Sequence, residues 1–315
     1  MIYTRRTHAT ARAGVAESCG VDGGFAFFEN LNFNTYWART ANPGVRGGDT
    51  SYQLQMNYNG DRYGVSMQRL YVGENFDPEI GFKRRSDFLK QRAQVRFSPR
   101  PRERFHAVRK FHYQASIELF TNHLHQLETR ERKGEFRIEF QNSDRFQVDV
   151  TNSYELLTEK FDIASDVTVP IGGYDLTTLR TEYEFGQQRR MSGIWFVEFG
   201  PFYGGQLKGI GYTGARLKLD QHLAVEPILQ INRVTLPYGD FTSQLVGART
   251  TYTITPEVFI SSLVQYNSSN NSLGANVRLR WEYQPGSEFF VVYNEGRETH
   301  STGIADLQDR ALRDA

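Results

Sequence analysis

Charged side chains that recur at every second position are the first candidates for chemistry in this chain. Arg278, Arg280 and Glu282 alternate with Leu279 and Trp281. Successive side chains of a β-strand point to opposite faces, so this spacing predicts a strand with one charged and one apolar face. The full set of candidates with this placement is Arg180, Glu182, Glu184, Arg216, Lys218, Arg278, Arg280 and Glu282. Such charges could line a water-filled channel and set its selectivity. Alternatively, they could neutralise one another across neighbouring strands and only solvate an interior.

The segment 72–86 gathers a second set of charges and aromatic rings. Its candidate binding residues are Glu74, Phe76, Asp77, Glu79, Phe82, Arg84 and Arg85. Paired carboxylates could serve glycoside hydrolysis or bind Ca²⁺, and the aromatic rings could stack on a sugar. The acidic and basic halves could equally pair with each other. We therefore expect a structural loop, folded into the mouth of a larger structure.

Other chemistry has little support in the sequence. His123 and His125 suit two ligands on one face of an extended segment, but a metal site needs three or four ligands. The sequence has no Gly-x-Ser-x-Gly elbow, no phosphate-binding loop and no dinucleotide fingerprint. We predict no catalytic residue, no metal and no cofactor, so an enzymatic role is the less favoured interpretation.

Period-2 alternation of apolar and polar residues extends over almost the whole chain and predicts an all-β protein. It is clear in the segments 52–58, 92–97, 135–141, 146–151, 179–185 and 273–284. The strands are about 9–13 residues long, which suits a tilted crossing of a membrane. Short turns are expected near 59–62, 98–102, 142–144, 187–190, 220–221, 255–257 and 284–287. Mostly longer connections are expected near 39–49, 72–86, 121–127, 159–173, 204–210, 235–241 and 268–271. This alternation favours an antiparallel transmembrane β-barrel over a soluble sandwich, with the short set periplasmic and the other set external.

The composition agrees with a β-barrel that has a water-filled interior and an apolar exterior. Aromatic residues make up 14% and charged residues 23% of the 315 residues. No stretch approaches the roughly 20 apolar residues of a membrane helix. A net charge of +1 argues against nucleic acid as a partner. The single cysteine, Cys19, excludes an intramolecular disulfide framework.

The strand count predicts a barrel of about sixteen strands. About fifteen strands follow from Phe25 onward, so 15 to 16 are expected in this chain, and bacterial single-chain barrels have an even number. Residues 1–22 are expected to be a weakly structured remnant and residues 23–315 the barrel. The segment 307–315 falls where a last strand belongs, but it is short and polar, so this strand is expected to be truncated or altered. The first residues have no apolar signal-peptide core, and we expect the native signal to lie upstream.

Two segments resemble a known family. The first is Gly-Glu-Asn-Phe-Asp-Pro-Glu-Ile-Gly-Phe at 73–82, followed by Arg85 and Phe88. The second is Trp-Glu-Tyr-Gln-Pro-Gly-Ser-Glu-Phe-Phe-Val-Val-Tyr-Asn at 281–294. Together they resemble an uncharacterised outer-membrane β-barrel family in which the barrel commonly follows a family 9-like carbohydrate-binding domain. The resemblance covers about residues 25–298 and implies a Gram-negative envelope location with a polysaccharide-related role. It carries over no catalytic residue.

Three functions remain open at this point. The first is a passive, porin-like pore in the outer membrane, with lipid outside and a small solute or an oligosaccharide inside. The second is a docking platform that anchors a carbohydrate-binding domain. The third is a membrane-associated glycoside hydrolase, which would need two converging carboxylates.

Overall fold

The computed structural model describes residues 2–8, 14–44, 47–78, 85–101, 103–164, 166–298 and 307–314. All regular structure in these residues is β-strand. They include no helix long and apolar enough to cross a membrane. The prediction of an all-β chain is therefore confirmed.

Twenty strands follow one another in the described part of the chain. The first ten are β1 (Ile2–His8), β2 (Gly14–Phe27), β3 (Leu31–Ala41), β4 (Thr50–Asn59), β5 (Tyr63–Val72), β6 (Phe88–Phe97), β7 (Val108–Thr121), β8 (Leu127–Phe140), β9 (Arg145–Leu157) and β10 (Phe161–Ala164). The others are β11 (Val167–Val169), β12 (Gly172–Phe185), β13 (Met191–Phe202), β14 (Gly205–Lys218), β15 (Leu223–Leu236), β16 (Gly239–Thr255), β17 (Val258–Asn267), β18 (Ser272–Gln284), β19 (Ser287–Glu298) and β20 (Leu307–Asp314).

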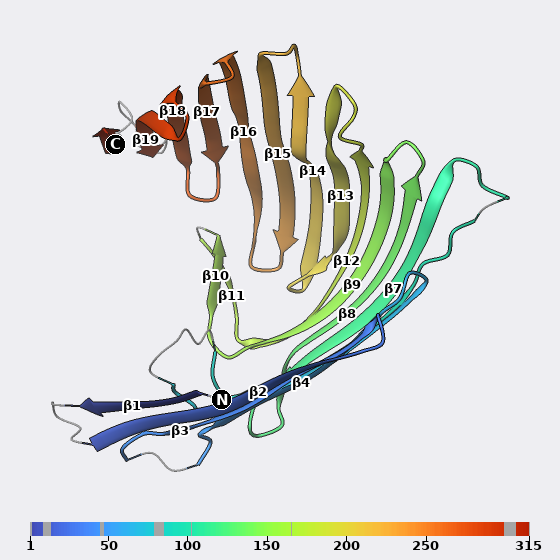
Figure 1. Ribbon diagram of the computed structural model, residues 1–315, viewed down its shortest axis with the longest axis vertical. Coiled ribbons are helices and arrows are strands. Elements are labelled where there is room, and N and C mark those ends of the chain that lie inside the picture. The colour runs from blue at the N-terminus through green and yellow to red at the C-terminus, as the bar shows by residue number, and fades with distance from the viewer. Residues whose placement is uncertain are drawn as a thin grey trace.

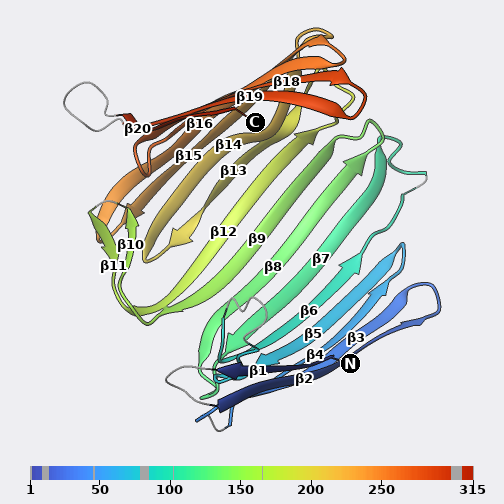
Figure 2. The same ribbon diagram turned by 60° about the vertical axis from the view of Figure 1, so that its left-hand side comes forward.

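Eighteen of these strands form one sheet, and β10 and β11 form a separate two-stranded hairpin. Each strand of the large sheet pairs antiparallel with the next along the chain, and β9 pairs with β12 across the inserted hairpin. The sheet curls around a hollow, with β1 at one edge and β19–β20 at the other (Figures 1 and 2). Within the described residues no ladder joins β1 to β20, so the sheet is open there. The expected count of about sixteen strands was too low, and closure into a barrel is not seen.

The miscount arises mainly at the N-terminus. Residues 2–8 form β1, and residues 14–22 form the first part of β2, where a weakly structured remnant was expected. The first segment contains Arg5 and Arg6, and in the second Glu17 interrupts the apolar positions. Neither segment therefore shows a regular hydrophobic alternation, although the backbone pairing of an antiparallel hairpin is complete. At the other end, β20 pairs with β19 at the place expected for the last strand.

The connections meet at two rims of the sheet. Rim A contains the connections 28–30, 60–62, 98–107, 141–144, 186–190, 219–222, 256–257 and 285–286. Rim B contains the connections 42–49, 73–87, 122–126, 158–171, 203–204, 237–238 and 268–271. The positions match the predicted turns, but three lengths do not. The 98–107 connection is longer than expected, whereas 203–204 and 237–238 are two-residue turns.

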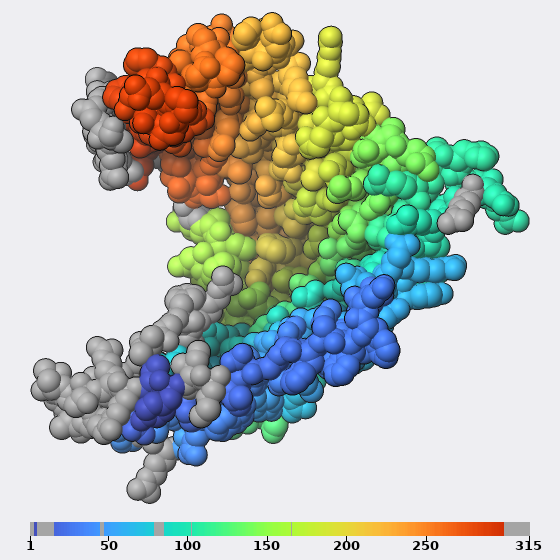
Figure 3. Space-filling view, viewed as in Figure 1, coloured from blue at the N-terminus to red at the C-terminus, as the bar shows by residue number. Residues whose placement is uncertain are grey.

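The two faces of the sheet have opposite character. Directly paired residues on neighbouring strands share a face. The concave face surrounds the hollow seen in Figure 3, and the register places mainly polar side chains on it. The convex face is apolar and exposed: Leu54 is 57%, Val95 55% and Val150 47% exposed. A soluble sandwich would cover such a face with a second sheet. No second sheet covers it in the part of the chain described here.

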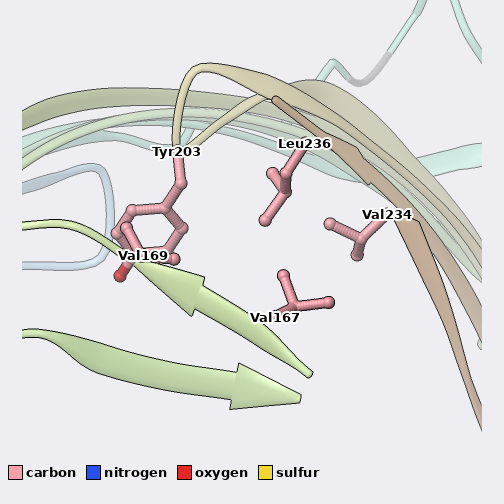
Figure 4. Packing of buried hydrophobic residues seen from close by; sticks show 5 residues of the cluster. All are labelled: Val167, Val169, Tyr203, Val234 and Leu236. Carbon is pink, nitrogen blue, oxygen red and sulfur yellow. The ribbon is translucent and has the colours of Figure 1, made fainter. Parts of the chain in front are cut away.

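The main buried cluster lies where the β10–β11 hairpin folds into the hollow. Val167 and Val169 of the hairpin pack against Tyr203, Val234 and Leu236 of the large sheet (Figure 4). Val234 and Leu236 lie on the concave face, so the hairpin covers an apolar patch that would otherwise meet water. Val169 is completely buried.

An ion pair between a buried carboxylate and a partly exposed arginine joins two neighbouring turns of rim A. Asp144 is completely buried, and its Oδ2 accepts hydrogen bonds from Arg189 Nη2 at 2.6 Å and the Tyr183 hydroxyl at 2.8 Å. Its Oδ1 accepts from Arg189 Nε at 3.0 Å and the Gly186 N–H at 2.9 Å. These donors, led by the Arg189 side chain, lower the pKa of Asp144 to about 2 against the opposing effect of burial. The carboxylate thus ties turn 141–144 to turn 186–190.

Candidate functional site

The concave face brings together the charged residues that alternation singled out. Arg180 lies opposite Glu198, which lies opposite Gly209, and this row continues through Asn232 to Ser243. Tracing the register in this way places all eight candidates on the same face: Arg180, Glu182 and Glu184 on β12, Arg216 and Lys218 on β14, and Arg278, Arg280 and Glu282 on β18. The face that sequence alternation predicted is therefore one continuous surface.

Arg180 is the centre of the first group on this surface. Its guanidinium contacts Glu182 at 3.1 Å and Glu198 at 3.2 Å, and it lies 3.7 Å above the centroid of the Phe196 ring. This arrangement buries Phe196, which is only 3% exposed, beneath a cation. Glu184 pairs with Arg145 of β9 at 2.9 Å. Arg180 and Glu184 are thus already engaged with neighbouring strands, and Glu182 is engaged with Arg180 of its own strand.

A second group on β8 and β9 was not among the predicted site residues. Lys133 contacts Asp149 at 3.3 Å and Glu135 at 3.9 Å, while Arg137 contacts Glu135 at 3.6 Å. The alternation in 135–141 and 146–151 contained part of the signal, because the polar positions of these segments include Glu135, Arg137 and Asp149. What the sequence could not show was the register that makes Lys133 and Asp149 neighbours.

The candidates on β14 and β18 differ in how they are paired. Arg280 contacts Glu282 at 3.3 Å and also pairs with Glu288 of β19. Arg278 lies 4.3 Å above the centroid of the Phe290 ring. Arg216 lies 3.9 Å from Glu226. No ion pair involves Lys218 or Arg278 among the residues with described side chains, so these two cations face the hollow with free charge.

The strands β4 and β5 continue the polar surface with neutral side chains, and β6 and β7 add contacts of Glu118 with Lys90 at 3.0 Å and with Arg92 at 3.8 Å. Gln68 donates to Gln53 at 3.2 Å, Ser66 to Asn57 at 2.7 Å, and Gln94 to Gln114 at 3.1 Å; these side chains are partly buried. Each amide of such a pair forms a hydrogen bond with its neighbour and still has N–H groups and oxygen lone pairs that can bind water. The concave surface therefore changes from neutral amides to charged pairs as it passes from β4 to β18.

The 73–87 connection was predicted to hold binding residues, and its described part is docked on a neighbouring loop. Asn75 N–H donates to the Gly48 carbonyl at 2.9 Å, and Asp77 N–H donates to Thr40 Oγ1 at 3.2 Å. Gly73 approaches Gly48 so closely that a Cβ at Gly73 would lie 2.1 Å from the Gly48 carbonyl oxygen. These contacts support the interpretation of a structural loop at rim B.

The charged side chains of this loop are also engaged. Glu74 lies 3.9 Å from His123 Nδ1, and Asp87 accepts a hydrogen bond at 2.6 Å from the same nitrogen. The hydrogen bond that His123 donates to Asp87 raises the pKa of His123. Arg85 pairs with Glu128 of β8. Phe76 lines a cavity of about 370 Å³ with Trp37 and Cys19, whereas Glu79, Phe82 and Arg84 lie outside the described residues.

A chain of side chains near rim A has the composition of a hydrolytic triad. Ser98 Oγ lies 3.0 Å from His112 Nδ1, and His112 Nε2 lies 2.9 Å from Glu139 Oε1. Sequence inspection missed this arrangement because the three residues are on separate elements. However, Ser98 is only 1% exposed and its Oγ accepts a hydrogen bond from Arg96 at 2.9 Å. A nucleophile needs access to substrate, so this chain fits a structural role.

Metal ligands do not gather in the described part of the chain, where no group of three His, Cys, Asp or Glu side chains is placed to hold an ion. His123 and His125 do not act together, because His123 binds Asp87 and His125 occupies a turn with a φ of 59°. The chemistry available at the concave face is consequently that of a hydrated, paired ionic surface.

Comparison with known proteins adds no relative. No protein-family model matches the chain, and no curated protein matches it significantly.

Proposed function

We propose that this chain is a transmembrane β-barrel of the outer-membrane type that acts as a passive pore for small solutes. The main support for the proposal is that the distribution of apolar and polar side chains is the reverse of that in a water-soluble protein. Large apolar side chains are exposed on the convex face, and polar and charged side chains line the concave face. Apolar surface of this extent costs free energy in water. A bilayer around the convex face removes that cost.

The dimensions of the strands support a membrane crossing. The sheet strands β3 to β19 contain 10 to 17 residues. At about 3.3 Å per residue and a tilt near 45°, ten residues span roughly 23 Å, close to the apolar band of outer-membrane barrels. Aromatic rings gather on the convex face near rim A, where Tyr63, Tyr113, Trp195 and Trp281 are exposed. Such rings suit a membrane–water interface.

The strand count supports a water-filled interior. With an even number of antiparallel strands, β1 and β20 would meet antiparallel if the sheet closed, and barrels of about 16–18 strands leave an aqueous channel. The β10–β11 hairpin would narrow that channel from rim B. Lipid is thus the partner of the convex face, and the hollow takes water and solute. A link to oligosaccharides and to the envelope depends on the family resemblance alone.

Single-channel conductance in a planar bilayer tests the proposal. The refolded chain should give steady currents that increase in proportion to salt. A variant with residues 160–170 replaced by a short Gly–Ser linker should conduct more, because the hairpin no longer occupies the hollow. Thr168→Ala, on the exposed side of the hairpin, serves as the control and should leave conductance unchanged. Absence of current from a verified, inserted barrel with and without the hairpin would exclude a pore.

The inward hairpin also favours a second candidate, a docking platform. If the hairpin and the paired charges fill the hollow, the protein would insert without conducting, and its rim B loops would be the contact surface. Conductance that appears only after removal of the hairpin would support this candidate over a constitutively open pore.

A further inference from the structure

We propose that the convex face near rim B binds the phosphate-bearing headgroups of anionic lipids through a belt of arginine and lysine side chains. The inference goes one step beyond the proposed membrane insertion and rests on it. It assigns the two rims to different lipid surroundings, which the pore function itself does not require.

The belt consists of basic residues on the convex face near the rim B ends of their strands. Its members are Arg39 on β3, Arg69 on β5, Arg130 and Arg132 on β8, Lys208 on β14, Arg233 on β15 and Arg297 on β19. Register places them on the convex face: Arg69 lies opposite Leu54, Arg132 opposite Ile117, and Lys208 opposite Phe199. Each lies within five residues of the rim B end of its strand.

Lys208 and Arg233 are the strongest evidence for an anion-binding site. They lie directly opposite each other on β14 and β15, and both are exposed. Like charges in direct cross-strand positions destabilise a sheet unless an opposite charge lies between them. No carboxylate pairs with either residue in the part of the chain that the structure describes. An anion shared by the two side chains would remove the repulsion.

Arg69 and Arg132 extend the same pattern on the other side of the sheet. Both are exposed, and neither forms an ion pair with a carboxylate of the described residues. The three remaining members do have acidic partners: Arg39 contacts Asp49 at 3.0 Å, Arg130 contacts Asp175 at 2.8 Å, and Arg297 contacts Glu295 at 2.5 Å. Four of the seven cations are thus available to an external anion.

The opposite end of the convex face has a different composition. Near rim A this face carries the exposed aromatic residues Tyr63, Tyr113, Tyr252 and Trp281, whereas near rim B it carries the cations of the belt. Aromatic rings suit an interface without strong charge, whereas guanidinium and ammonium groups form charge-assisted hydrogen bonds with phosphate. Because the cations border the apolar band, the phosphate they meet belongs to a lipid headgroup at that depth. Rim B is therefore the end that faces the more anionic lipid surface.

Spin-label electron paramagnetic resonance tests the belt. The full chain is reconstituted in phosphatidylcholine vesicles, and the association constant of spin-labelled phosphatidylglycerol is measured relative to spin-labelled phosphatidylcholine. We expect roughly five-fold preference for the anionic lipid, the effect of about one basic side chain per lipid. The preference should disappear in 1 M NaCl (about the concentration at which the Debye length is 3 Å).

Two matched variants distinguish an effect of the belt from an effect of the net charge of the protein. R69Q/R132Q/K208Q/R233Q removes the four available cations and should abolish the preference. R216Q/K218Q/R249Q/R278Q removes three arginines and one lysine from the concave face and should keep it. Equal preference in both variants, or no preference in the wild type despite insertion, would overturn the belt and leave the pore proposal standing. Failure of the wild type to insert would overturn both.

Discussion

The buried carboxylate of Asp144 provides a sharp test of how the turns of rim A are held. In Asp144→Asn the negative charge is lost, although the side chain keeps its size and one oxygen. The Arg189 guanidinium then loses its ionic partner. Two donors at 2.6 Å and 2.8 Å, from Arg189 and Tyr183, also lose a charged acceptor.

The pKa of Asp144 sets the magnitude. Its folded value of about 2 lies below the ordinary value of 3.8, and each pKa unit corresponds to about 1.4 kcal/mol, so the ionised form contributes about 2 kcal/mol of stability. A lowered pKa means that this contribution is present in full above the unfolded value. It should therefore be complete at neutral pH and be lost as the pH falls from about 4 toward 2. The substitution should destabilise the protein by a similar amount at neutral pH.

The assay is urea unfolding of the refolded protein in detergent micelles, followed by tryptophan fluorescence at pH 7 and pH 3. Asp61→Asn is the matched control. Asp61 is also a turn carboxylate of rim A, and it pairs with Arg100 at 2.6 Å, but both side chains are more than half exposed. Exposed pairs contribute about 0–1 kcal/mol. If Asp144→Asn and Asp61→Asn lowered the free energy of unfolding equally, the reasoning from burial would be refuted.

Three further substitutions test other features of the structure. Val277→Arg, on the convex face, should lower stability in a bilayer by about 2–4 kcal/mol, whereas Asn276→Arg on the concave face should have a much smaller effect in the same unfolding assay. Gly73→Ala should separate the loop from Gly48, since the added Cβ would meet a carbonyl oxygen at 2.1 Å, and limited proteolysis should then cleave the loop faster. Val169→Ala should cost roughly 2 kcal/mol of hairpin packing, measured as faster proteolysis of residues 158–171, and unchanged cleavage would contradict a packed hairpin.

The sequence predicted the strands and their faces well because a side-chain period of two is a local property. Alternation in 273–284 placed Arg278 and Arg280 on one face and Leu279 on the other, and β18 (Ser272–Gln284) has that arrangement. Pairing partners are not local. The contact between Lys133 and Asp149 depends on the register of β8 against β9, which no single segment contains.

Glycine misled the prediction at β14. The glycines at 205, 209 and 211 suggested a loop near 204–210, but these residues lie within a strand. A Cβ at Gly211 would lie 2.5 Å from the Phe196 ring, and one at Gly205 would lie 1.9 Å from the Thr235 carbonyl oxygen. Glycine is used there for close packing rather than for a turn. The real turn is Tyr203-Gly204, where both residues have positive φ values of 44° and 80°, as a tight hairpin requires.

The paired charges of the concave face bear on what kind of pore this chain would form. Arg180, Arg145 and Arg280 each contact a glutamate, so these cations and anions largely cancel at the wall. Permeating ions would then meet a hydrated surface with little net potential. Exceptions include Lys218, Arg249 and Arg278, which lack an ion-pair partner among the described side chains and would attract anions weakly. A pore of this kind should discriminate by size at the β10–β11 hairpin more than by charge. Replacing a single arginine of the concave face distinguishes the two possibilities. A pore that selects ions by charge would lose its selectivity, whereas a pore whose charges only solvate the hollow would not.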